Sequence, residues 1–224
     1  MMTVKANIQE IRKQLPPHVK MVVVTKTMPV EKLREAYDCG ERIFGENKVQ
    51  ELLAKQPQLP TDIQWHLIGH LQTNKVKHIA SFVGMIESAD SLKLLQEIDK
   101  QACKAGRKQD VLLQFHIAEE ETKFGLDLDE ARVLLHHLSL NPLPNISICG
   151  VMGMATYTND VQQLTKEFRH LRLIFDTLKS DFFAGSDSFK EISMGMSGDY
   201  ALAISEGATM VRIGTKIFGE RNYP

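Results

Sequence analysis

The sequence has few cysteines, no excess of either charge and no long apolar run. Its three cysteines, Cys39, Cys103 and Cys149, lie far apart and form no CxxC pair, so neither a disulfide framework nor a zinc site is expected. Lysine and arginine number 27 against 28 aspartate and glutamate, a net charge of −1, which provides no basic field for nucleic acid. No stretch reaches the roughly 18 apolar residues of a membrane span, and the polar start of the chain lacks the apolar segment of a signal peptide. We therefore expect a cytoplasmic protein with reduced thiols.

Short β-rich runs alternate with helical patterns along the whole chain, without a linker between them. Strands are predicted at 20–25, 42–45, 64–69, 82–87, 110–117, 145–152, 190–194 and 209–213. Helices are predicted at 29–40, 46–55, 74–80, 91–105, 127–138, 161–180 and 199–206. Strict alternation indicates a parallel sheet with right-handed crossovers, and eight strands can close a TIM-type (β/α)8 barrel. An open doubly wound sheet is the alternative, but no GxGxxG follows the first strand. We predict a single α/β barrel domain over residues 1–224.

A lysine stands at the end of the first predicted strand. Lys26 directly follows the run MVVVT, and in a TIM barrel the groups that carry chemistry lie at the carboxyl ends of the strands. A lysine in that place is partly withdrawn from water, which frees its amine to act as a nucleophile or to form a Schiff base. The alternative is a lysine whose ammonium only reaches solvent at the barrel mouth.

Two glycine-containing segments follow the seventh and eighth strands, where TIM barrels frequently bind phosphate. In the segment 193–199 (SMGMSGD), Ser197 is the expected N-cap of the next helix, and the glycines would let a phosphate approach the backbone. In the segment 212–215 (RIGT), Gly214 and Thr215 offer a backbone N–H group and a hydroxyl. Taken alone, the first segment is also compatible with a simple capped turn, and Arg212 with a structural salt bridge. The presence of both segments in these two loops predicts a phosphate site.

Other polar residues near the strand ends carry weaker signals. Asn47 either hydrogen-bonds a ligand or caps the next helix. His66 and His70 have an HxxxH spacing, but no third ligand accompanies them, so a metal is not expected and His66 is expected to fill the barrel interior. His116 either stacks on a flat ligand or is simply packed. Because the chain has no GxSxG elbow or P-loop, the lysine and the phosphate site leave two options. One is an aldolase that forms an imine with a phosphosugar, and the other is a protein that binds pyridoxal 5′-phosphate (PLP).

Several sequence blocks occur in one order along almost the whole chain, from about Val22 to Pro224. They are VTKT (24–27), FGENKVQE (44–51), WHLIG (65–69), LQTNK (71–75), KFG (123–125), MGMS (194–197) and MVRIGTKIFG (210–219). Together they resemble the YggS/PROSC family, the PLP homeostasis proteins, which adopt the barrel of alanine racemase and other fold-type III PLP enzymes.

The resemblance implies a role for each candidate residue. Lys26 forms the internal aldimine with PLP, and Asn47 lies near the ring. Arg212 lies beside the cofactor and faces either the pyridine nitrogen or the phosphate. The phosphate is held by a set of three residues: Ser197, Gly214 and Thr215.

Two positions depart from the family pattern. Met28 stands where the family often has a lysine, which removes a charge near the barrel mouth. His116 stands where the family often has an asparagine, which alters the surroundings of the ring. Neither departure removes a proposed PLP anchor.

A racemase of this fold carries a second, β-rich domain, which together with the partner subunit supplies a tyrosine as a second acid/base. This chain ends a few residues after the eighth strand, and none of its four tyrosines (Tyr37, Tyr157, Tyr200 and Tyr223) has an obvious place for that role. The resemblance therefore implies a barrel without the C-terminal β domain. It also implies a role in PLP (vitamin B6) homeostasis, with PLP held as a Schiff base on Lys26 and no turnover.

A PLP-dependent amino-acid racemase is the alternative activity. The aldolase and a cofactor-free docking module are the remaining hypotheses. The expected partners are PLP itself and PLP-dependent apo-enzymes as recipients, with no nucleic acid and no membrane, and the chain is expected to be a monomer.

Overall fold

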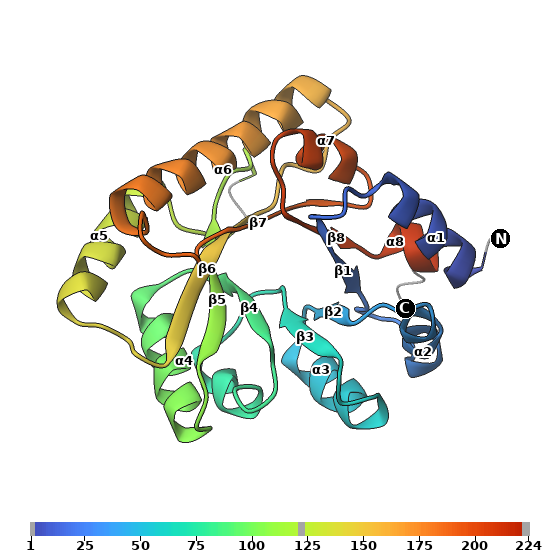
Figure 1. Cartoon of the computed structure of the whole chain (residues 1–224), viewed down its shortest axis with the longest axis horizontal. Helices are drawn as coiled ribbons and strands as arrows, with labels where there is room; N and C mark the ends of the chain where they lie inside the picture. Colours follow the sequence, from blue (N-terminus) through green and yellow to red (C-terminus); the bar gives the residue numbers. More distant parts are fainter. Residues whose placement is uncertain (1–2, 121–123, 221–224) are drawn as a thin grey trace.

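The computed structural model describes residues 3–120 and 124–220, and in this part of the chain eight parallel strands form a closed barrel (Figure 1). The strands follow one another around the barrel in sequence order: β1 (Lys20–Val24), β2 (Ile43–Glu46), β3 (Gln64–Leu67), β4 (Met85–Ala89), β5 (Gln109–Phe115), β6 (Ile146–Gly153), β7 (Glu191–Met196) and β8 (Met210–Ile213). Parallel pairing of β1 with β8 closes the ring. The predicted TIM-type barrel is confirmed, and the open sheet is excluded.

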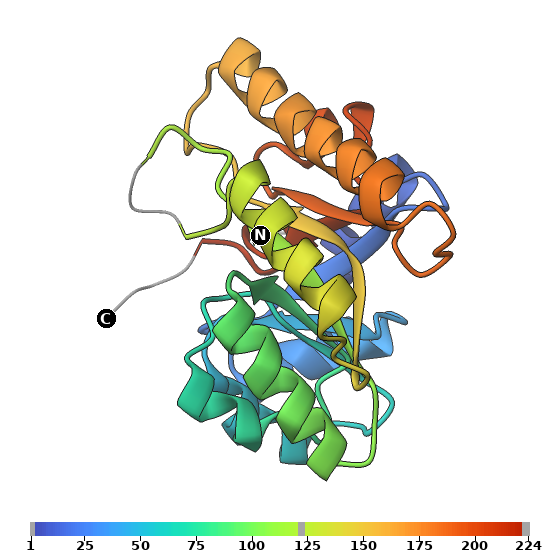
Figure 2. The ribbon, with the colours of Figure 1, turned by 90° about the vertical axis from the view of Figure 1, so that its left-hand side faces the viewer.

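The helices cover the outside of the barrel (Figures 1 and 2). They are α1 (Val4–Gln14), α2 (Val30–Asp38), α3 (Val49–Lys55), α4 (Leu92–Lys104), α5 (Leu128–Leu140), α6 (Val161–Phe182), α7 (Tyr200–Ser205) and α8 (Thr215–Phe218), with 3₁₀ helices η1 (Gln56–Gln58) and η2 (Thr73–His78). Figure 2 brings α4, α5 and α6 to the front of the sheet. Within the two described ranges, no helix is both long and apolar enough to span a membrane.

The apolar residues form two layers, one on each face of the barrel wall. Val22 and Val24 lie in an interior cluster with Ile68, Met85, Leu112, Cys149, Met152 and Met210. Val23 and Phe44 belong to the larger core between the strands and the helices. This alternation follows from the period of two in a β-strand. β1 ends at Val24, and Lys26 follows it at the carboxyl end of the barrel wall.

The boundaries of several elements differ from the prediction. The fourth strand was expected at 82–87 but begins at Met85, because the backbone N–H groups of Phe82 and Val83 bond the carbonyl of Ile79 and continue the turn after η2. The helix expected at 46–55 is α3, yet Glu46 is the last residue of β2 and the helix starts at Val49. The helix expected at 74–80 is the 3₁₀ helix η2. Short polar segments contain too few apolar residues for the sequence pattern to locate the first residue of a strand or helix.

Candidate functional site

The candidate residues lie on four consecutive strands at one end of the barrel. In the registers of these strands, Val24 is paired with Gly45, Val22 with Arg212, and Met196 with Arg212. Lys26 and Asn47 each lie two residues beyond the pair Val24–Gly45, so they extend from neighbouring strands. The carboxyl ends of β7, β8, β1 and β2 therefore bring Ser197, Arg212, Lys26 and Asn47 to one side of the barrel mouth.

The turn after β7 presents Ser197 to the loop after β8. The hydroxyl oxygen of Ser197 accepts hydrogen bonds from the backbone N–H groups of Gly214 (3.2 Å) and Lys216 (3.4 Å). The prediction that Ser197 caps the next helix is wrong. The N-cap of α7 is Asp199, and its carboxylate accepts from the backbone N–H of Met196, which closes the turn one residue later. Gly195 at the start of this turn has a φ of +89°, and a Cβ there would lie 2.5 Å from Ala203, so glycine is required.

The donors around Ser197 fit the phosphate of PLP. Two backbone N–H groups converge on one oxygen, the hydroxyl of Ser197, and phosphate oxygens can take the same place. A Cβ built on Gly198 meets no atom within 4 Å, so the space above the turn is open. Thr215 is exposed beside these donors. The phosphate site predicted from the two loops is thus one connected set of donors.

Asn47 does not cap the following helix. The N-cap of α3 is Lys48, without a side-chain hydrogen bond, so the capping alternative for Asn47 is wrong. The end of β3 approaches the Asn47 backbone closely, because a Cβ on Gly69 would lie 2.4 Å from the Asn47 carbonyl oxygen. Asn47 itself is half-buried at the mouth, where it can meet a bound ring.

Arg212 is part of a buried polar network that crosses the barrel interior. Its Nη1 donates to the hydroxyl of Ser193 (2.6 Å) and its Nη2 to the carbonyl of Gly153 (2.9 Å). Ser193 donates in turn to Oε2 of Glu87 (2.6 Å), and Nδ1 of His66 lies 2.7 Å from the other oxygen of that carboxylate. The nearest charged atoms of Arg212 and Glu87 are 4.0 Å apart. The network joins β3, β4, β6, β7 and β8 and holds the guanidinium in place.

The network sets the charge of its members. Burial alone would raise the pKa of Glu87, but the hydrogen bond from His66, the charges of His66 and Arg212 and the Ser193 hydroxyl together lower it below its ordinary value. Burial lowers the pKa of Arg212, and the charges of Glu87 and Asp199 oppose that change. The Glu87 carboxylate therefore remains the anion that balances the buried guanidinium at neutral pH.

The remaining predicted residues lie elsewhere. His66 is buried inside the barrel, as expected. His70 pairs with Asp90 (3.4 Å) and stacks on Phe124, and Nε2 of His116 bonds the carbonyl of Glu120 (2.9 Å) within its own loop. No group of three potential metal ligands occurs in residues 3–120 and 124–220.

The tyrosines are dispersed in the fold. The hydroxyl of Tyr37 bonds Asp62 and that of Tyr200 bonds Gln14, both outside the barrel. Tyr157 follows β6 at the mouth and is 93% exposed. Tyr223 and Lys123 lie outside the described residues.

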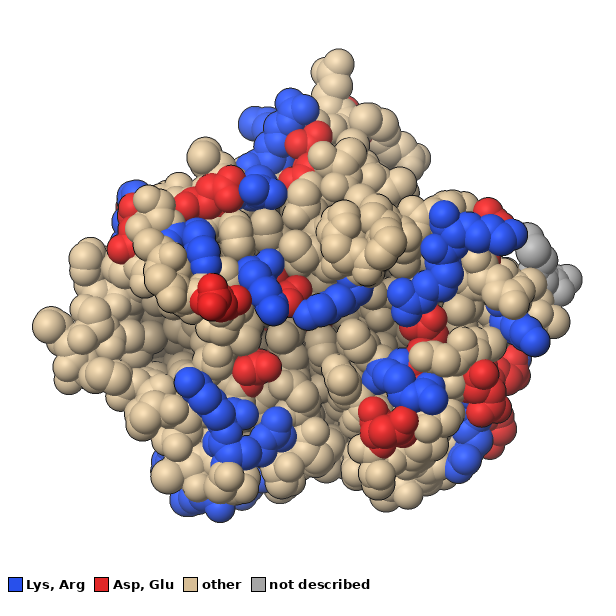
Figure 3. All heavy atoms as spheres, viewed as in Figure 1, with Lys and Arg blue, Asp and Glu red and all other residues tan. Residues whose placement is uncertain are grey.

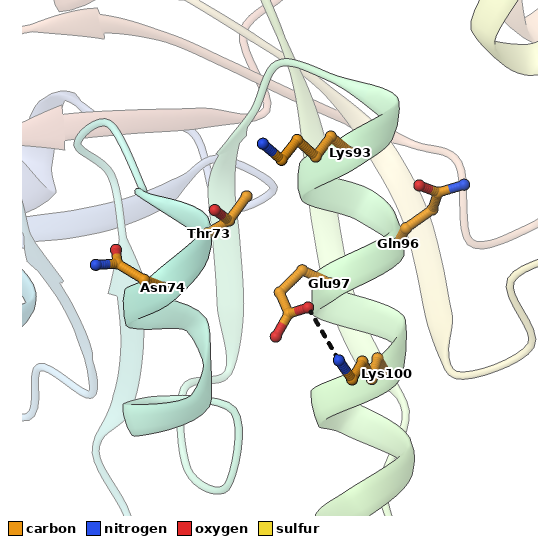
Figure 4. Close-up of a pocket in the computed structure, with 6 residues that line it drawn as sticks. All are labelled: Thr73, Asn74, Lys93, Gln96, Glu97 and Lys100. Carbon is orange, nitrogen blue, oxygen red and sulfur yellow. Dashed lines mark ion pairs between the residues drawn. The ribbon is translucent and has the colours of Figure 1, made fainter.

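A separate shallow pocket of about 390 Å³ lies on the outer surface, between η2 and α4 (Figure 4). Its polar lining includes Lys93 and an ion pair between the exposed Lys100 and the half-buried Glu97 (3.7 Å). None of the predicted site residues lines it. The lining residues of the outer pocket are exposed or half-buried, whereas the predicted lysine and the two predicted phosphate loops lie together at the barrel mouth, which is therefore the candidate site.

Some residues that shape the site were not identified from the sequence. Glu87 is a charged residue within the buried strand β4, and a charge in such a run is a signal of a paired interior group. Glu46, Glu51 and Lys55 surround the backbone next to Lys26, and only the spacing of Glu51 and Lys55, four residues apart on one helix, hinted at their pairing.

Comparisons with known proteins identify the family of this chain. The family model described as alanine racemase, N-terminal domain, matches residues 2–222. The pyridoxal phosphate homeostasis protein of Aquifex aeolicus is 42% identical over 91% of this chain and 88% of its own length. The human protein of the same name is 36% identical over 91% of this chain and 77% of its own length.

Solved structures show the same barrel. PipY of Synechococcus elongatus, solved with PLP bound, is 36% identical with a TM-score of 0.88, covering 97% of this chain and all of that one. An alanine racemase of Clostridium difficile is 17% identical with a TM-score of 0.80, covering 99% of this chain and 60% of that one. At that identity the likeness shows the fold alone.

Proposed function

This chain belongs to the family of pyridoxal phosphate homeostasis proteins, built on the alanine racemase N-terminal domain, and from this premise we propose that it holds PLP as a Schiff base on Lys26. The observation that carries the proposal is the convergence of Lys26 with the donors of Ser197 and Gly214 on adjacent strands. Residues 1–224 form one PLP-binding barrel domain under this proposal.

Each residue has a defined task when PLP is bound. The Ser197 hydroxyl, the Gly214 backbone N–H and the Thr215 hydroxyl hold the phosphate. When bound, PLP would supply an aldehyde that condenses with the Lys26 amine to a C=N bond and releases one water molecule. Asn47 would lie near the ring, and Arg212, fixed by Ser193 and Gly153, would lie beside the cofactor.

The same geometry supports binding without turnover. An arginine does not give up its proton at neutral pH, so Arg212, if it faces the pyridine nitrogen, leaves PLP a weak electron sink. Tyr37 and Tyr200 are held by partners outside the barrel and cannot act as a second acid/base at the mouth. Tyr157 lies at the mouth but is 93% exposed, so packing does not fix its hydroxyl against a bound ligand. We infer a monomeric cytoplasmic carrier that supplies PLP to apo-enzymes. On the face shown in Figure 3, lysine and arginine side chains are interspersed with aspartate and glutamate. A mixed surface of this kind does not favour binding of nucleic acid, which needs a continuous basic patch.

The test is the absorption spectrum of the purified protein with PLP, before and after borohydride reduction, followed by peptide mass mapping. We expect an imine band that borohydride abolishes and a pyridoxyl adduct on Lys26. An adduct on another lysine, or none at excess PLP, contradicts the proposal. Conversion of L-alanine to D-alanine at a steady rate, lost in Lys26→Ala, would establish the racemase instead of the carrier.

Ser197→Ala should weaken phosphate binding without harming the fold. One hydrogen bond to a charged group is worth about 1.5 kcal/mol, a roughly tenfold rise in Kd. Pyridoxine 5′-phosphate is the probe, because it has the same ring and phosphate but no aldehyde. Ser205→Ala is the matched control, since its hydroxyl only bonds the Leu202 carbonyl on the surface of α7. Equal affinities of both variants and wild type would remove Ser197 from the phosphate site.

A further inference from the structure

Lys26 occupies a strained turn. The backbone N–H of Met28 bonds the carbonyl of Thr25 (3.0 Å), which makes Lys26 and Thr27 the two central residues of a tight turn. Thr27 has a φ of +64°, the only positive value among the non-glycine residues that the structure describes. A β-branched residue in this conformation costs on the order of 1–3 kcal/mol and persists only where surrounding contacts enforce it.

Three side chains behind the barrel wall enforce this turn from both sides of Lys26. Before the lysine, Nζ of Lys55 donates to the Thr25 carbonyl (2.8 Å), and the Thr25 hydroxyl donates to Oε1 of Glu46 (2.6 Å). After the lysine, the backbone N–H of Thr27 donates to Oε2 of Glu51 (2.8 Å). These contacts reach the residues next to Lys26 from β2 and α3.

The three side chains are bound to one another as a unit. The Lys55 ammonium has three N–H donors, and they meet three acceptors: the Thr25 carbonyl, Glu46 (2.6 Å) and Glu51 (3.0 Å). Glu46 is fully buried and Lys55 nearly so, whereas the Glu51 side chain is 27% exposed. Desolvation offsets much of the attraction within a buried ion pair, so such a pair adds little to stability and its effect here is on the geometry of the turn.

Burying the charged groups of Glu46 and Lys55 behind the turn has an energetic cost. Burial raises the pKa of Glu46, although the ammonium of Lys55 and the hydrogen bonds from Lys55 and Thr25 oppose the change. Oε2 of Glu46 is buried without a hydrogen-bond partner in the described part of the chain. Apolar residues of similar size would avoid this cost, so the arrangement indicates that the position of the turn matters.

We propose that Lys55, Glu46 and Glu51 form a clamp that positions Lys26, by fixing the backbone on both sides of it so that its amine faces the ligand. This inference rests on the proposed function, in which Lys26 is the residue that attaches PLP. Lys55 and Glu51 are positioning residues that do not touch the ligand. With the clamp opened, Thr27 relaxes to a negative φ, the turn changes and the amine samples unproductive directions.

Glu51→Leu is the variant that tests the clamp, because Glu51 is partly exposed and its loss is compatible with folding, whereas Lys55→Met buries uncompensated carboxylates. Borohydride trapping at short times gives the rate of PLP attachment to Lys26. We expect a roughly tenfold slower rate with an unchanged Kd for pyridoxine 5′-phosphate. Glu51→Gln keeps an oxygen for the Thr27 N–H and should restore most of the rate.

An experiment on the protein without PLP tests the clamp independently of the proposed function. Acetic anhydride labels the Lys26 amine in the apo-protein, and peptide mapping gives its labelling rate across pH. We expect the pH profile of Lys26 to shift in Glu51→Leu but not in Glu35→Leu, which also removes a carboxylate paired with a lysine but breaks a more exposed pair, with Lys32 within α2. An unchanged rate and profile, or equal changes in Glu35→Leu, overturn the clamp. Wild-type protein that never attaches PLP at Lys26 overturns the proposed function, while the labelling profile still decides the clamp.

Discussion

Lys26→Ala should abolish covalent attachment of PLP. The variant should show no imine band and no pyridoxyl adduct after borohydride, and its affinity for PLP should fall on the order of a hundredfold, roughly 2.7 kcal/mol. The reason is that Lys26 is the lysine at the carboxyl end of β1, beside the donors of Ser197 and Gly214. Because Lys26 is half-buried at the mouth and outside the core, the free energy of unfolding should change little.

Two controls make the result specific to the amine. Lys26→Arg keeps the positive charge but has no nucleophilic amine, so it should lack the adduct as well. Lys32→Ala removes an exposed lysine that pairs only with Glu35 on α2, and it should behave as wild type. The Kd for pyridoxine 5′-phosphate should be similar in all of these proteins. A pyridoxyl adduct that survives in Lys26→Ala would place the attachment on another lysine.

Glu87→Leu should give the largest loss of stability. Glu87 is fully buried and faces Arg212, His66 and Ser193 inside the barrel. Its removal leaves the buried guanidinium without its balancing carboxylate, and breaking a buried pair in this way costs about 3–5 kcal/mol. The measurement is the free energy of unfolding from denaturant titration. Glu10→Leu, at an exposed pair with Lys13, is the control and should change it by less than about 0.5 kcal/mol.

The pH dependence of Glu87→Gln follows from the sign of the Glu87 pKa shift. The folded-state pKa is lowered, so the carboxylate contributes stability above the unfolded value of about 4.3 and this contribution is lost as the pH falls toward the folded value. We expect the stability difference between wild type and Glu87→Gln to be constant near neutral pH and to shrink in acid. A difference that grows as the pH falls from neutral to about 4.3, and then levels off, would mean that the folded-state pKa of Glu87 is raised instead.

Much of the fold and part of the candidate site could be predicted from local patterns. The run MVVVT ends at Lys26, and an apolar run buried on both faces indicates a parallel strand whatever surrounds it. The same pattern placed Gly214 and Thr215 after β8. These predictions needed only the period of the strands and the rule that chemistry lies at their carboxyl ends.

Other predictions failed because their outcome depends on distant residues. Ser197 was expected to cap a helix, yet its hydroxyl meets N–H groups 17 and 19 residues further along the chain. The start of β4 was misplaced, because the aromatic residue Phe82 matched a strand pattern while its backbone continued the turn after η2. Local propensity cannot decide between such alternatives when tertiary contacts are stronger.

The sequence by itself indicated the alternation of strands and helices, the lysine at the end of β1 and the two glycine-containing loops after β7 and β8, because apolar periodicity and chain order are local properties. Only the tertiary structure decided the surroundings of these residues. Glu87 and Ser193 are 106 residues apart in sequence and 2.6 Å apart in the barrel, and the turn of Lys26 is fixed by side chains of β2 and α3. Closure of the sheet brings these residues together. Because a buried charge is costly without a hydrogen-bond partner, its partner is decided by the residues that the fold places next to it, whatever their distance in sequence.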